Sequence, residues 1–74
     1  MSKLPALKPK EMARVARRLG FILDRQRGSH AIYLRATDNR RVVIPMHNHD
    51  LKPGTLHGLL RDLGITGEEL SELL

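Results

Sequence analysis

Two segments of the chain place apolar residues at the spacing of an amphipathic helix. The first spans residues 8–19, and its apolar positions fall at i, i+3, i+4 and i+7: Met12, Val15, Ala16 and Leu19. Pro9 suits the first helical turn. Gly20 followed by Phe21 is typical of a helix end that a left-handed glycine closes. We expect a helix with a buried apolar stripe and a basic flank exposed to solvent, which includes Arg14.

The second segment begins at Pro53 and repeats this pattern with the leucines Leu56, Leu59, Leu60 and Leu63. Gly64 and Ile65 then repeat the helix ending of the first segment. Thr66 and Glu69 have the spacing of a capping box, in which each side chain accepts a hydrogen bond from the other residue's backbone. The spacing predicts a second helix followed by a short C-terminal helix within residues 66–74.

Between the helices, three stretches are rich in β-branched and aromatic residues and are separated by turn residues. Residues 21–26, 31–35 and 41–45 are predicted to be strands of an antiparallel sheet, with turns at 28–29 and 36–40. Residues 46–52 form a polar loop. Strict alternation places His30, Ile32 and Leu34 on one face of the second strand, and we expect this face to point to the core. The alternate residues Ala31, Tyr33 and Arg35 would then point outward.

This order predicts one α+β domain over residues 1–74, with its core in residues 8–65 and a short helix in residues 66–74. An antiparallel sheet covers its apolar face with both helices and leaves the other face to solvent. Two layers of this size leave little room for a pocket that encloses a small molecule. We therefore expect no small-molecule cofactor.

Charge is distributed unevenly along the 74 residues, whose formal net charge is +5. Residues 1–35 carry nine Lys and Arg against Glu11 and Asp24, a net charge of +7, whereas residues 36–74 carry −2. A basic half and a sequence pI near 10.5 are typical of proteins that bind nucleic acid. The chain has no cysteine, which excludes disulfides and thiolate nucleophiles. It has no apolar run of about 20 residues and no signal-peptide pattern, so a cytoplasmic protein without a membrane partner is expected.

Four histidines can exchange protons near neutral pH: His30, His47, His49 and His57. His57 fits an exposed position in the second helix. His47, His49 and Asp50 include metal-ligand types, but a closed zinc site needs four ligands and the chain has no cysteine, so no metal is expected. His47 follows the third strand, where it can instead contact a substrate.

His30 follows a turn with small side chains, Gly28 and Ser29, and Arg27 precedes that turn. An imidazole beside accessible backbone amides and a guanidinium is suited to acid–base chemistry on a phosphodiester. The alternative is that His30 simply begins the second strand and points to the core. These residues alone do not decide between the two interpretations of His30.

Four motifs in order resemble those of the HicA toxin family of bacterial toxin–antitoxin modules. They are Gly20-Phe21, residues 27–33 with Gly28-Ser29-His30, residues 43–47 with Pro45 and His47, and residues 51–56. The resemblance spans about residues 8–65. It implies a fold similar to double-stranded RNA-binding domains, a ribonuclease that cleaves messenger RNA, His30 as the catalytic residue, and a HicB antitoxin that covers the site.

On this basis we expect an endoribonuclease that requires no metal and inhibits translation and growth. Arg27, Gly28, Ser29 and Lys52 are expected to contact the RNA phosphate, with further RNA contacts from Arg14 and His47. Two alternatives belong to other classes. A noncatalytic RNA-binding module would use the same basic surface for phosphate contacts, and a protein-interaction domain would use it to bind an acidic partner.

Overall fold

The computed structural model of the protein describes residues 4–74. Its elements follow in the order α1 (Pro9–Arg18), β1 (Ile22–Arg27), β2 (His30–Arg35), β3 (Arg40–Pro45), α2 (Pro53–Leu63) and α3 (Gly67–Leu73). The predicted α+β class and the order α-β-β-β-α with a short C-terminal helix are confirmed. The N-terminal segment, in which no signal-peptide pattern was found, begins with residues 1–3. These three residues lie outside the described residues.

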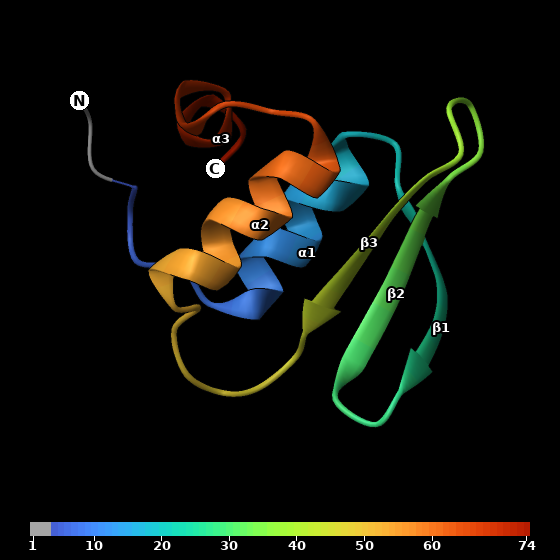
Figure 1. The fold of residues 1–74 in the computed structure, drawn as a ribbon, viewed down its shortest axis with the longest axis horizontal. Helices are drawn as coiled ribbons and strands as arrows, with labels where there is room; N and C mark the ends of the chain where they lie inside the picture. The colour runs from blue at the N-terminus through green and yellow to red at the C-terminus, as the bar shows by residue number, and fades with distance from the viewer. Residues whose placement is uncertain (1–3) are drawn as a thin grey trace.

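The three strands form one antiparallel sheet in the order β1-β2-β3. β2 pairs with both neighbours: His30 lies opposite Arg27 of β1 and opposite Pro45 of β3. α1 and α2 lie on the same side of the sheet, where both contact β3 (Figure 1). β1 is the strand farthest from the helices, and all six of its residues are exposed.

The core lies between the two helices and the β2–β3 half of the sheet. Its largest fully buried side chains come from every layer: Phe21, Met12, Ile44, Leu63, Leu70, Val15 and Val42. No polar or charged residue among residues 4–74 is buried as a whole. Burial of apolar area is therefore the main favourable term in the stability of this small fold.

Each of the first two helices ends as the sequence predicts. Gly20 has a φ of +92°, and its N–H donates to the carbonyl of Arg17, while the N–H of Phe21 donates to the carbonyl of Ala16, both at 3.0 Å. These two bonds define a Schellman ending. α2 ends with the same pair of bonds at Gly64, whose φ is +77°. Phe21 therefore points into the core, and β1 begins at the next residue, Ile22.

The capping box of α3 is also confirmed. The backbone N–H of Glu69 donates to Thr66 Oγ1 at 3.1 Å, and the N–H of Thr66 donates to Glu69 Oε1 at 2.9 Å. Leu70 is fully buried and α3 contacts α1. The capping box thus fixes the start of a helix that closes one end of the core.

The prediction that Ala31 and Tyr33 point outward is wrong. Both are core residues, with 2% and 4% of their surface exposed, and Ile32 is also buried, with 8% exposed. The Tyr33 hydroxyl accepts a hydrogen bond from Arg17 Nη1 of α1 at 3.4 Å. Since alternation holds, His30 lies with Ile32 and Leu34 on the face turned away from the helices.

Within residues 4–74, none of the helices has both the length and the apolar character that a membrane span needs.

Candidate functional site

The centre of the site is the two-residue connection between β1 and β2. Gly28 and Ser29 join Arg27 to His30, which lie opposite each other in the register. Gly28 has a φ of +58°, whereas Ser29 has no positive φ, which fits a type II′ turn with glycine in its first central position. Gln26 Nε2 donates to the carbonyl of Gly28 at 3.2 Å. The turn therefore has a defined shape.

His30 is exposed at the first position of β2. His30 does begin β2, but it does not point to the core, because the face of the sheet that carries it is turned away from the helices. No hydrogen bond is found for the His30 ring among residues 4–74, so its nitrogens are available to a ligand. An accessible imidazole on a fixed strand position is open to a surface-bound substrate, as a general acid or base has to be.

Arg27 supplies the positive charge of this turn. Its side chain is exposed, and it has no ion pair within the described part of the chain. Since Arg27 and His30 are paired across the hairpin, the guanidinium and the imidazole extend from adjacent positions of one hydrogen-bonded frame. A cation and an imidazole held in this way suit a phosphodiester substrate.

The loop that follows β3 lies against the same turn. The N–H of Met46 donates to the carbonyl of Ser29 at 2.6 Å, so the ladder between β2 and β3 extends one residue beyond His30. His47 comes directly after this bond. The structure thus brings His47 to the end of the sheet that carries His30.

His47 is half-buried and stacks on His49, with ring centroids 3.7 Å apart and planes 9° from parallel. His47 Nδ1 is buried and has no hydrogen-bond partner within residues 4–74. No role was predicted for His49. Its i+2 spacing from His47 in a short loop is the sequence signal for this ring stacking. The stack fixes the His47 ring plane.

The remaining loop contacts tie it to the start of α1. Lys8 Nζ lies 3.4 Å from Asp50 Oδ1 and donates to the carbonyl of Asn48 at 3.4 Å. The N–H of Leu51 donates to the carbonyl of Leu7 at 2.8 Å. These bonds hold the loop between β3 and α2 against the N-terminal segment.

Lys52 and Arg14 are not joined to the turn by any hydrogen bond or ion pair of the described residues. Lys52 is exposed directly before α2, where its carbonyl accepts from the N–H of Leu56 at 2.8 Å. Arg14 is exposed on α1, one turn before Arg17, which bonds Tyr33. Both are separate basic positions, and a bound polymer would have to extend beyond the turn to contact them.

No group of three or more His, Cys, Asp or Glu side chains suitable for a metal ion is found within residues 4–74. The stacked pair His47 and His49 and the neighbouring Asp50 do not form one, and the Asp50 carboxylate is paired with Lys8.

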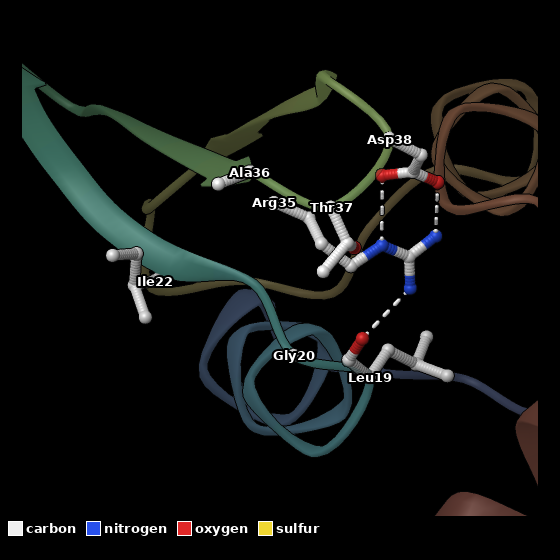
Figure 2. A pocket seen from close by; sticks show the side chains of 7 residues that line it. All are labelled: Leu19, Gly20, Ile22, Arg35, Ala36, Thr37 and Asp38. Carbon is white, nitrogen blue, oxygen red and sulfur yellow. Dashed lines mark hydrogen bonds and ion pairs between the residues drawn. The ribbon is translucent and has the colours of Figure 1, made fainter.

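A hollow of about 620 Å³ lies at the opposite end of the sheet from His30. It is lined by Leu19, Gly20, Ile22 and the first residues of the β2–β3 turn (Figure 2). Arg35 crosses it, since Nη1 donates to the carbonyl of Leu19 at 2.7 Å and Nε donates to Asp38 Oδ1 at 3.0 Å. The site around His30 is therefore a surface site, distinct from this hollow.

Arg35 and Asp38 form an ion pair in which both pKa values are shifted from their ordinary values. The hydrogen bond from Arg35 holds the pKa of the Asp38 carboxyl below its ordinary value. The same bond raises the pKa of Arg35. Arg35 also lies over the Phe21 ring, with its Cζ atom 4.6 Å from the ring centroid. The pair stabilises the far end of the hairpin and is not part of the His30 site.

The sequence was compared with known protein families, and a match covers most of the chain. The sequence model of the family described as the HicA toxin of bacterial toxin–antitoxin matches residues 9–65, which is more than half of the chain. The match contains the turn from Arg27 to His30 and the loop residue His47. Comparison with the curated proteins gives no match. The family match confirms the resemblance found in the sequence motifs.

Proposed function

Since this chain belongs to the HicA toxin family of bacterial toxin–antitoxin modules, we propose that it is an endoribonuclease that cleaves messenger RNA with His30 as its acid–base residue. The observation that supports this most is the position of His30. It is exposed on the helix-free face of the sheet, at a two-residue turn and opposite Arg27.

In the proposed reaction, a nitrogen of His30 accepts the proton of an RNA 2′-hydroxyl. The 2′-oxygen forms a bond to the adjacent phosphorus, and the bond from phosphorus to the 5′-oxygen of the next nucleotide breaks. The leaving 5′-oxygen takes a proton from water. The products are a 2′,3′-cyclic phosphate and a 5′-hydroxyl, so the substrate itself supplies the nucleophile and the reaction requires no metal.

The phosphate is bound by groups of the same turn. Arg27 offers a charged donor, and the backbone around Gly28 is open, because a Cβ atom added there would meet no atom within 4 Å. Amides and a guanidinium aimed at a phosphate stabilise the charge that develops during attack. The Ser29 hydroxyl orients the phosphate or the imidazole.

RNA contacts beyond the turn come from His47, Lys52 and Arg14. His47 lies next to the turn, and the bond from Met46 to Ser29 fixes the loop that carries it. Lys52 and Arg14 contact the backbone on either side of the cleaved bond. A single acid–base side chain contributes about 10²- to 10⁴-fold in rate, so we expect a slow enzyme that depends on these positioning contacts.

The biological role follows from the family. Cleavage of messenger RNA in the cytoplasm inhibits translation and growth, and a HicB-type antitoxin neutralises the toxin by covering the site. The family membership shows that an antitoxin partner belongs to the system.

The test compares His30→Ala with His57→Ala. Both histidines are exposed, but His57 lies on α2, away from the turn. Purified variants, with their fold checked by circular dichroism, are incubated with a messenger RNA. We expect His30→Ala to lose cleavage by at least about 100-fold and His57→Ala to cleave as the parent does. Equal cleavage by His30→Ala and the parent contradicts the assignment, and RNA binding without cleavage by the parent favours the noncatalytic alternative.

A further inference from the structure

The strand β1 carries the most exposed apolar residues of the described chain. Ile22 is 70% exposed and Leu23 is 50% exposed, and the third large apolar residue of this kind, Leu74, is 47% exposed at the C-terminus. Each face of the sheet therefore exposes one large apolar side chain at the start of β1. Neither residue belongs to the His30 turn.

β1 is also an edge of the sheet. Among residues 4–74 it pairs only with β2, so along its other side the backbone N–H and C=O groups have no strand partner there. Such an edge is a template for an added strand. Ile22 lies opposite Leu34 and Leu23 opposite Tyr33, on the two different faces of the sheet. A strand added to β1 would therefore contact Ile22 with one side chain and Leu23 with the next.

Two surface hollows beside Ile22 offer space for an apolar side chain of a partner. The 620 Å³ hollow begins there, and a second hollow of about 220 Å³ is lined by Ile22, Leu34 and the β2–β3 turn. The polar atoms of Arg35 are already bonded to Leu19 and Asp38, so they do not need a ligand. Figure 2 shows Ile22 at the side of the hollow, across from this network.

The arginines of β1 favour an acidic strand as its partner. After Ile22 and Leu23, β1 carries Arg25 and Arg27, with Asp24 already 3.4 Å from Arg25. If two copies of β1 paired about the centre of the strand, Arg27 of one copy would lie opposite the apolar Ile22 of the other and gain no acidic partner, which disfavours a second copy of this chain. An acidic strand would instead neutralise these arginines.

We propose that β1 is the docking edge for an acidic extended segment of the antitoxin, which adds a fourth strand to the sheet. Apolar side chains of that segment cover Ile22 and Leu23, and acidic ones pair with Arg25 and Arg27. Because β1 runs directly into the turn at residues 28–29, the added strand ends beside Arg27, which lies opposite His30. Docking rests on the antitoxin partner of the family, whereas inhibition of cleavage rests also on the proposed function.

The test uses Ile22→Glu, with Leu74→Glu as the matched control, since both replace an exposed apolar residue by the same charge. The probe is the purified protein encoded by the reading frame adjoining the gene of this chain, titrated by isothermal calorimetry. We expect Ile22→Glu to weaken its binding by about tenfold or more, while Leu74→Glu binds as the parent does. RNA cleavage by free Ile22→Glu should remain that of the parent.

Unchanged antitoxin binding by Ile22→Glu overturns the proposal, and so does failure of that probe to bind the parent. A loss of RNA cleavage in Ile22→Glu assigns the edge to RNA instead, and a shift from dimer to monomer in sedimentation assigns it to a second copy. Both results also overturn the proposal. If Ile22→Glu does not fold, hydrogen exchange on the parent decides, because the amides of residues 22–27 must gain protection in the complex. A parent that binds through β1 but never cleaves RNA refutes the proposed function alone.

Discussion

Replacing Gly28 by alanine tests whether the turn that holds His30 depends on its backbone conformation. The φ of Gly28 is +58°, and an added Cβ atom would meet nothing within 4 Å. Any cost is therefore a cost of the backbone and not of a clash. Positive φ at this position costs a non-glycine residue about 1–3 kcal/mol, and the lower entropy of the unfolded alanine chain returns about 0.4–1 kcal/mol. The expected net loss is about 1 kcal/mol.

Gly54 is the matched control for this change. It also has open space around its Cβ position, but it lies in the first turn of α2 and has no positive φ. Alanine there should stabilise the fold by up to about 1 kcal/mol, because alanine is the better helix former. The two replacements add the same methyl group and are expected to have opposite signs.

Thermal unfolding followed by circular dichroism measures both changes. For a domain of this size, 1 kcal/mol corresponds to a shift in Tm of roughly 4–8 °C. We expect the Tm to fall by about that amount in Gly28→Ala and to rise in Gly54→Ala. Gly28→Ala should also cleave RNA more slowly at a temperature where it is fully folded, because the turn that positions His30 is distorted. An unchanged or higher Tm for Gly28→Ala refutes the reasoning.

Two further predictions concern stability away from the site. The pKa of Asp38 is lowered by Arg35, so the pair stabilises the fold above the ordinary carboxyl pKa of about 3.9. This contribution is lost as the pH falls through the lower pKa of the folded state. In urea unfolding, the difference between the parent and Asp38→Asn should shrink from about pH 6 to about pH 2, and a constant difference contradicts this. Thr66→Ala removes the side-chain cap of α3 and should cost about 1 kcal/mol, whereas Ser71→Ala on the same helix should be nearly neutral; equal Tm values for the two variants would contradict the role of the cap.

The helix ends and the order of elements were accessible from the sequence because they depend on local chemistry. Gly20 and Gly64 end their helices through bonds that span six residues, and Thr66 caps a helix within four. Interactions of this range are encoded by neighbouring residues. The same holds for the turn at Gly28, whose two residues can be read directly from the chain.

The face of β2 could not be predicted in the same way. Alternation divides the strand into two sets but does not state which set the helices cover. The sequence favoured the set with Ile32 and Leu34 because these side chains are apolar. In the structure, the smaller Ala31 and the amphipathic Tyr33 lie under the helices, since the Tyr33 hydroxyl finds a partner on α1. Tertiary contacts of this kind decide the exposure of His30.

Exposure of β1 likewise depends on the packing of distant elements. Ile22 and Leu23 have the composition of buried strand residues, and they lie in solvent because the helices cover the β2–β3 half of the sheet and not β1. The register shift between Leu23 and Arg25 is also absent from any sequence pattern. The hairpin of the site was thus predictable, whereas the surface beside it required the fold.

The origin of the nucleophile tests the central claim most directly. An RNA with one strong cleavage position is prepared with its ribose intact and with a single 2′-deoxy nucleotide at that position, and the ends of the products are identified by mass spectrometry. The account predicts a 2′,3′-cyclic phosphate and a 5′-hydroxyl from the intact RNA and no cleavage at the 2′-deoxy position. Products with a 5′-phosphate, or cleavage at the 2′-deoxy position, would contradict it.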